Sequence, residues 1–271
     1  MNALTLRLKS RPRMPIDASA LTPSRLAGLK PAAIGALALR CGNRVVAVRE
    51  LFDISGTDAS AIRILGATDQ LDRIGADLAG GSIEVRGSVG DNLGEGMRDG
   101  TILVRGDAGT CAGVGMRGGR ITITGDAGDF LGAALPGELE GLREGTIHVH
   151  GRAGDRVGES QRSGLILIEG DAGDYCGSRM RAGTILVLGR AGRYVGDGMR
   201  RGTIILRRPP ALIGATFNSN GRLELPILRL LFRQLPLGDR RLAHLQKFAP
   251  QAERLAGDLA VGGKGELLLL G

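Results

Sequence analysis

Aromatic residues are scarce in this sequence: it has no tryptophan, two tyrosines and five phenylalanines among 271 residues. An ordinary globular core uses more aromatic side chains than this. Nucleic acid is disfavoured as a partner, because no aromatic residues are interleaved with basic ones to stack on bases. There is also no apolar run long enough to span a membrane, and residues 1–15 lack the apolar core of a signal peptide.

Cysteine is equally scarce. Cys41, Cys111 and Cys176 are far apart, odd in number and outside any CxxC motif. The sequence therefore predicts neither a disulfide framework nor a zinc site, and it favours the reducing cytoplasm.

Glycine and positive charge are abundant instead. The 46 glycines indicate many tight turns, and the net charge of +8 favours an anionic partner, either an acidic protein or a polyanionic cofactor. A generally arginine-rich proteome would explain the charge equally well.

The glycines belong to an internal repeat. A seven-residue run beginning at Gly81 returns every 19 residues, except for one interval of 26 that indicates a seven-residue insertion around residues 133–139. Each full unit also carries the motif GxxGxxxG. The runs begin at Gly81, Gly100, Gly119, Gly145, Gly164, Gly183 and Gly202, and the motifs at Gly87, Gly106, Gly125, Gly151, Gly170 and Gly189.

Within a unit, apolar and polar residues alternate as they do in a strand: Ile83 and Val85 alternate with Glu84 and Arg86. One unit cannot bury its own apolar side, but stacked units can. We therefore predict a mainly β fold, a right-handed single-stranded parallel β-helix of about seven 19-residue coils. The inward positions form three ladders, which start at Ile83, Val85 and Leu93.

The chain is predicted to have three parts: an α/β cap over residues 1–59, the β-helix over 60–207, and a helical tail with a final strand over 208–271. In the cap we expect a strand at residues 4–8, a short helix after Thr22, and a hairpin of residues 36–40 and 44–49. In the tail we expect helices at residues 226–235 and 240–256 and a strand after Gly257.

Several outward positions are apolar where a solvated face would be polar, which marks a covered surface. Either a partner subunit covers it, which we favour, or a terminal segment of the same chain does. A second outward column contains aromatic residues that could anchor an interface. The candidate interface residues are Leu103, Leu167, Leu186 and Ile205 in the first column, and Phe130, Tyr175 and Tyr194 in the second.

An arginine column also follows the repeat, and stacked like charges need an anionic counterpart. We favour internal pairing with the repeated aspartates Asp91, Asp129, Asp155 and Asp174. The alternative is an acidic partner or an acidic cofactor tail, for which the candidate contacts are Arg98, Arg117, Arg162 and Arg200.

No catalytic residue or metal ligand is predicted. The GxGxxG match at Gly113 is a by-product of the repeat and opens no helix, so it is not a dinucleotide site. His148 and His150 lie two residues apart on a predicted strand and are interpreted as a surface pair.

The GxxGxxxG coils resemble the C-terminal β-helical domain of the glutamate synthase large subunit. The whole chain resembles the C subunit of formylmethanofuran dehydrogenase, and most of all its version in bacterial formyltransferase/hydrolase complexes. The features that carry this resemblance are the array from Gly81 to Gly202, the Gly-Met-Arg endings at Gly96, Gly115 and Gly198, and the tail between Glu253 and Glu266.

The resemblance implies a non-catalytic structural subunit of a complex that converts formyl-tetrahydromethanopterin to formate through a methanofuran-type carrier, in formaldehyde oxidation. It implies amidohydrolase-type, formyltransferase and dehydrogenase-B-like partner subunits. Three alternatives stay open: the C subunit of a tungsten or molybdenum formylmethanofuran dehydrogenase, a stand-alone glutamate-synthase-type domain, and an enzyme that uses a groove on the β-helix.

Overall fold

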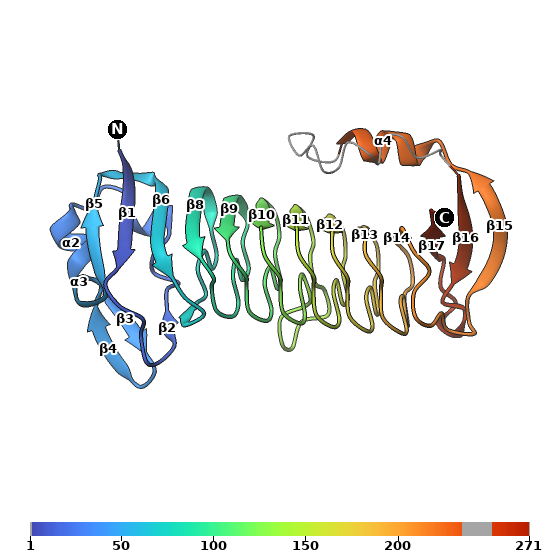
Figure 1. Ribbon diagram of the computed structural model, residues 1–271, viewed down its shortest axis with the longest axis horizontal. Helices are drawn as coiled ribbons and strands as arrows, with labels where there is room; N and C mark the ends of the chain where they lie inside the picture. Colours follow the sequence, from blue (N-terminus) through green and yellow to red (C-terminus); the bar gives the residue numbers. More distant parts are fainter. Residues whose placement is uncertain (1, 235–250, 271) are drawn as a thin grey trace.

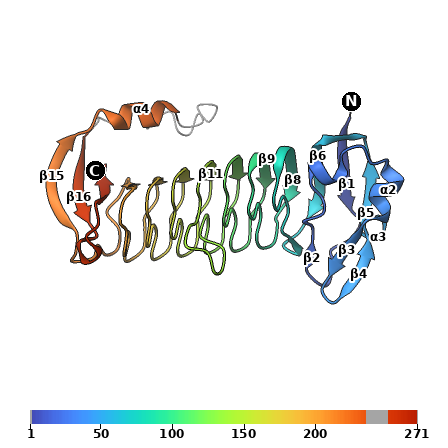
Figure 2. The same ribbon diagram turned by 180° about the vertical axis from the view of Figure 1, so that it is seen from behind.

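The computed structural model describes residues 2–234 and 251–270. The chain forms a long rod with its two termini at opposite ends (Figures 1 and 2). Its main feature is one sheet of 13 strands. In spatial order these strands are β15 (Asn218–Glu224), β16 (Gln251–Gly257), β17 (Gly265–Leu269), β14 (Thr203–Leu206), β13 (Thr184–Val187), β12 (Leu165–Ile168), β11 (Thr146–Val149), β10 (Arg120–Ile123), β9 (Asp99–Arg105), β8 (Ala79–Gly87), β6 (Asp58–Ala67), β1 (Ala3–Leu8) and β5 (Phe52–Ser55).

The repeat forms the parallel, β-helix-like part of this sheet, from β6 to β14. Each strand pairs in register with its equivalent one repeat later, so that Ile102 lies opposite Ile121 and Ile121 opposite Ile147. The predicted isoleucine ladder is therefore confirmed. Both ends extend it, because Leu4 of β1 pairs with Ile62 and Leu267 of β17 pairs with Ile204.

The opposite side of each coil is also stacked. Single parallel bridges join Ala108, Ala127, Ala153, Ala172 and Ala191 in sequence. Each coil thus contacts the next along two lines, and the side chains between the lines form a continuous buried core.

The GxxGxxxG motif is explained by the tight spacing of the coils. A Cβ atom on Gly106, the first glycine of its unit, would lie 2.6 Å from the backbone of Gly87 in the preceding coil. A Cβ atom on Gly113, the third glycine, would lie 2.5 Å from Cδ1 of Ile147, and Gly113 has a φ of +67°. Only glycine combines that left-handed conformation with so little space.

The aspartates that follow the repeat bond to the backbone of the next coil. The Oδ1 atom of Asp91 accepts a hydrogen bond from the Thr110 amide at 2.7 Å, and that of Asp174 accepts one from the Arg193 amide at 2.7 Å. These bonds tie successive turns together. The same contact is made by Asp72, Asp107, Asp126, Asp129, Asp155 and Asp171.

The N-terminal end caps the stack with short elements. A sheet of four strands contains, in order, β4 (Arg44–Ala47), β3 (Ala38–Cys41), β2 (Ile16–Asp17) and β7 (Leu71–Asp72). The predicted strand, short helix and hairpin are present. The hairpin is shorter than predicted, because its last residues form a helix. The helices here are α1 (Pro23–Leu26), α2 (Pro31–Ala36) and α3 (Val48–Leu51).

The C-terminal end differs from its prediction in one element. The helix expected at residues 226–235 is α4 (Ile227–Gln234), and the final strand is β17. The second helix, expected at residues 240–256, is wrong over residues 251–256, which form β16 and pair antiparallel with β17; the rest of it lies outside the described residues. A short 3-10 helix, η2 (Leu259–Val261), joins β16 to β17.

The α4 helix covers the outward face of the sheet near β13 and β14 (Figures 1 and 2). Its Leu228 and Phe232 side chains join Leu167, Leu186 and Ile205 in a second apolar cluster. Those three candidate interface residues are fully buried by the chain itself. Our preference for a partner subunit was therefore wrong for them, and the alternative, coverage by a terminal segment, is what the structure shows.

Candidate functional site

A column of residues with left-handed backbone conformation lies on the surface of the rod. Its members occupy equivalent positions of successive coils, directly after the position of Asp91, Asp129, Asp155 and Asp174, and each has a φ between +58° and +60°. Bulky side chains in this conformation are strained, by roughly 1–2 kcal/mol each. The column contains Asn92, Cys111, Phe130, Arg156, Tyr175 and Tyr194.

The larger members of the column stack on one another. The rings of Tyr175 and Tyr194 are 5.1 Å apart and 21° from parallel. The Arg156 guanidinium lies 5.0 Å from the Tyr175 ring centre and 5.9 Å from that of Phe130. Phe130 and Tyr194 are both more than one-third exposed. The predicted aromatic candidates thus form one continuous surface, in which the arginine joins the rings by cation–π contacts.

A groove of about 660 Å³ runs beside this column. One wall is the inserted loop, residues 133–140, which contains no helix or strand and contributes Leu135, Pro136 and Leu139. The remaining lining residues come from successive coils and from Val261 of η2. The coil residues are Asn92, Cys111, Val114, Phe130, Glu159, Ser160, Arg179, Arg181, Gly198 and Arg200.

The arginine column lies next to the groove and is largely neutralised by the inserted loop. Glu138 contacts Arg143 at 2.9 Å and Arg117 at 3.8 Å. Glu140 contacts Arg162 at 3.4 Å and Arg181 at 3.6 Å. These glutamates accompany the insertion rather than the repeat, so the 19-residue period gave no signal for them.

The arginine column is therefore paired within the chain, as we predicted, but the predicted aspartates are not its partners. The four repeated aspartates bond to backbone amides instead. The acid that contacts Arg98, at 3.6 Å, is Asp77, which is not one of them. Among the four candidate anion contacts, Arg98, Arg117 and Arg162 thus have carboxylate partners within the chain. Arg200 lines the groove, and no ion pair to it occurs among the described residues.

The groove also contains a buried acid and a thiol. Glu159 is nearly buried and contacts Arg179 and, at 3.4 Å, Arg156. Burial raises the pKa of the Cys111 thiol above its ordinary value, so that the thiol is protonated near neutral pH. In the core behind it, burial raises the pKa of Cys176 to about 12. The groove is therefore suited to binding by aromatic, arginine and apolar contacts more than to nucleophilic attack by its thiol.

Comparison with known proteins agrees with this description. The model of the GXGXG motif family matches residues 75–220, more than half of the chain, which places it in the class of proteins with this glycine repeat. A chain in the crystal structure of the formyltransferase/hydrolase complex FhcABCD from Methylorubrum extorquens, in complex with methylofuran, superposes with a TM-score of 0.90. It is 42% identical, and the match covers 98% of both chains.

Curated relatives match over shorter segments. The C subunit of the formyltransferase/hydrolase complex Fhc of M. extorquens is 42% identical over 86 residues, which is 32% of each chain. The C subunit of molybdenum-containing formylmethanofuran dehydrogenase 1 of Methanosarcina barkeri is 38% identical over 80 residues, 28% of this chain and 27% of the relative. The matched segments thus span about a third of these relatives' length. The chain belongs to the GXGXG family, together with the C subunits of formyltransferase/hydrolase and formylmethanofuran dehydrogenase complexes.

Proposed function

We propose that this chain is the structural, non-catalytic C subunit of a formyltransferase/hydrolase complex. Such a complex would transfer the formyl group of formyl-tetrahydromethanopterin to a methanofuran-type carrier and hydrolyse it to formate. The observation that carries the proposal is the full-length similarity to a chain of the FhcABCD complex, at 42% identity over 98% of both chains. That FhcABCD structure is a complex with methylofuran, a carrier of the methanofuran type.

The rod suits a scaffold because its strands are tied together along two lines and its rigid surface positions side chains at a fixed spacing. Its partners would be an amidohydrolase-type subunit, a formyltransferase subunit and a dehydrogenase-B-like subunit. The right-handed sense of the coil, the count of about seven coils and the division at residues 59 and 207 stay predictions that belong to this proposal. In the part of the chain that the structure describes, no helix is long and apolar enough to cross a membrane.

Two surfaces are the best candidates for contact with the partners. One is the aromatic column beside the groove, where Phe130 and Tyr194 are exposed on a rigid backbone. The other is the outer side of α4, where Ile227 is 62% exposed and Leu230 is 54% exposed. Large apolar side chains on a short exposed helix are typical of an interface with another subunit. Leu103, which is half-buried and does not belong to the cluster beneath α4, stays a weaker candidate.

The arginines that line the groove would suit an anionic carrier tail. Because Arg98, Arg117 and Arg162 already have acidic partners, Arg200 is the candidate with the most charge to offer such a ligand. In this proposal the tail lies along the groove between Arg200 and the inserted loop. Carrier retention in the purified complex would then fall on neutralising Arg200.

Affinity purification of the tagged full-length chain from its source cell tests the proposal. We expect formyltransferase-type and amidohydrolase-type subunits to co-purify in fixed ratio, with formate production from formyl-tetrahydromethanopterin. The double substitution Phe130→Asn and Tyr194→Asn should reduce the recovery of at least one of them. Asparagine keeps the left-handed conformation, as Asn92 does at the equivalent position, so the rod should stay folded.

The matched control is Val45→Asn, which changes a 72% exposed side chain of β4, far from the groove. It should leave the recovered subunits unchanged. Recovery of the chain alone, without either enzyme subunit, would contradict the proposed function. Equal recovery with the double variant and with the control would exclude the aromatic column while leaving the scaffold role intact.

The dehydrogenase version of the complex is the second candidate. The molybdenum-containing relative and the C subunit of tungsten-containing formylmethanofuran dehydrogenase 2 of Methanothermobacter wolfeii are 38% and 37% identical over their matched segments. Metal analysis of the same purified complex separates the two versions. Molybdenum or tungsten in stoichiometric amount would favour the dehydrogenase.

A further inference from the structure

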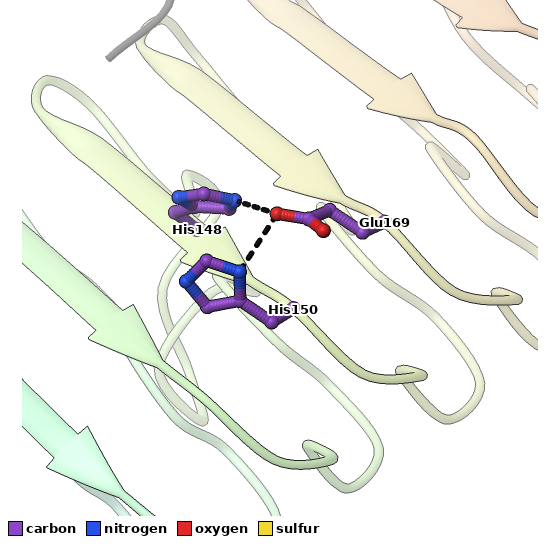
Figure 3. A group of neighbouring side chains, drawn as sticks. All are labelled: His148, His150 and Glu169. Carbon is purple, nitrogen blue, oxygen red and sulfur yellow. Dashed lines mark hydrogen bonds and ion pairs between the residues drawn. The ribbon is translucent and has the colours of Figure 1, made fainter. Parts of the chain in front are cut away.

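Two histidines and one glutamate meet on the outward face of the sheet (Figure 3). The Nε2 atom of His148 lies 2.8 Å from Oε1 of Glu169, and Nδ1 of His150 lies 2.7 Å from the same oxygen. The two imidazole rings are 4.3 Å apart. One ligand atom from each residue lies within 4.8 Å of the other two.

The repeat brings these side chains together. His148 and His150 are two residues apart on and just after β11, so they point to the same side of the sheet. Glu169 lies 19 residues after His150, at the equivalent position of the next coil, directly after β12. Parallel strands place such equivalent positions about 4.8 Å apart. The interpretation of the histidines as a surface pair was therefore incomplete, because His148 is buried and both rings face an acid.

The cluster lies next to the apolar part of the outward face, which covers β12 to β14. In the coil after Glu169, the positions equivalent to His148 and Glu169 are Leu186 and Leu188, which belong to the cluster beneath α4. The side chains of His148, His150 and Glu169 are only 5%, 12% and 13% exposed. Burying polar groups is unfavourable unless partners compensate for the lost water, and the contacts of the two rings with the Glu169 carboxylate provide part of this compensation. A bound cation would compensate both the carboxylate and the two ring nitrogens at once.

We propose that His148, His150 and Glu169 form a binding site for a divalent transition metal ion of the zinc class. Two imidazole nitrogens and one carboxylate oxygen are a donor set that zinc accepts readily, with one coordination position left open. The ligands come from two successive coils. The ion would therefore join β11 to β12 where the covered half of the outward face begins.

The distances fit such a site after a small adjustment. Ligand atoms about 2.0–2.2 Å from an ion in tetrahedral arrangement are separated by roughly 3.3–3.6 Å. The two nitrogens must then move less than about 1 Å from the glutamate oxygen, which side-chain rotation can supply. Each nitrogen that faces the oxygen would give up its proton when it binds the ion.

Zinc binding by the full-length chain, freed of metal with a chelator, tests this proposal. Competition with a zinc-sensitive fluorescent chelator and metal analysis after gel filtration should give one Zn²⁺ per chain. The substitutions His150→Ala and Glu169→Gln should each weaken Zn²⁺ binding at least about tenfold. The matched control is Glu84→Gln, which removes an outward carboxylate that faces arginines instead of histidines.

Co²⁺ provides a second measurement that needs no variant. In the wild-type chain it should give the intense visible absorption of a four-coordinate site with nitrogen and oxygen ligands, and Zn²⁺ should abolish it. Zn²⁺ that stays bound in full to both variants would place it elsewhere on the chain and overturn the proposal. Should the variants fail to fold, absence of the Co²⁺ spectrum in the wild-type chain would overturn it as well.

Discussion

The outward face of the large sheet differs between its two halves, although the same repeat builds both. Across β6, β8 and β9, most of the outward side chains are charged and partly exposed, and the apolar Leu103 is half-buried. Glu84 contacts Arg105 at 2.9 Å, Arg86 at 3.3 Å and Arg63 at 3.6 Å. Across β12 to β14 the face consists of Leu167, Leu186 and Ile205 beneath α4.

The inward side shows no such difference. Isoleucine occupies the first ladder position in every repeat strand of both halves, and it is buried throughout. The inward pattern therefore determines that coils stack, whereas the outward pattern determines what else each coil contacts. This is the division expected of a solenoid, in which each unit is stabilised mainly by its neighbours.

The outward leucines give the strongest test of this difference between the halves. Replacing Leu186 with Asn should lower the free energy of unfolding by about 3–5 kcal/mol, because it leaves a cavity and an unsatisfied amide beneath α4. The equivalent change Leu103→Asn, on the open half, should lower it by roughly 1 kcal/mol or less. Chemical denaturation of the full-length variants measures both.

Equal losses of unfolding free energy for Leu186→Asn and Leu103→Asn would contradict the difference between the two halves of the outward face. They would mean either that α4 does not cover Leu186 in solution or that another element covers Leu103. Protection of the α4 amides from hydrogen exchange distinguishes these outcomes, because only the first leaves the helix unprotected.

A smaller effect, equal in both halves, is expected at the inward positions. Ile102→Val and Ile185→Val each remove one methylene group from the shared ladder. Each should lower the free energy of unfolding by about 0.5–1.5 kcal/mol. The two values, measured by the same denaturation, should agree to within about 0.5 kcal/mol. A large difference would show that the coils are not packed equivalently on their inward side.

The inward ladders could be predicted from the sequence because like residues at a fixed spacing are a local and repeated signal. Ile83, Ile102 and Ile121 need only stacking to become neighbours, and the structure places them so. The glycine motif was predictable for the same reason. Its positions are those where successive coils come too close for a side chain.

The contacts that depend on single, non-repeated segments could not be predicted in this way. Nothing in the period indicates that α4 folds back over Leu186, or that Glu138 and Glu140 of the inserted loop neutralise the arginine column. The cluster at Glu169 did leave a signal, because 19 residues separate it from His150. The cluster becomes predictable only when His150 is compared with Glu169, the residue at the equivalent position of the next coil.

The smallest effect is expected in the charged half of the outward face. The hydrogen bond from Arg105 is the main cause that lowers the pKa of Glu84 below its ordinary value, and Arg86 adds to it. A carboxyl group whose pKa is lower in the folded state stabilises the fold above its unfolded pKa, about 4.3. That contribution is lost as the pH falls through the folded-state pKa.

Glu84→Gln should therefore lower the free energy of unfolding at pH 7 by less than about 1 kcal/mol, because the ion pairs are at the surface. The difference from the wild type should shrink as the pH falls below about 4.3, and it should also shrink in high salt at pH 7. Glu144→Gln is the control for net charge, since Glu144 is exposed and has no ion pair among the described residues. If the difference in unfolding free energy between Glu84→Gln and the wild type grew on acidification, the arginines would not stabilise the Glu84 carboxylate. The charge network would then not explain why this half of the outward face differs from the half beneath α4.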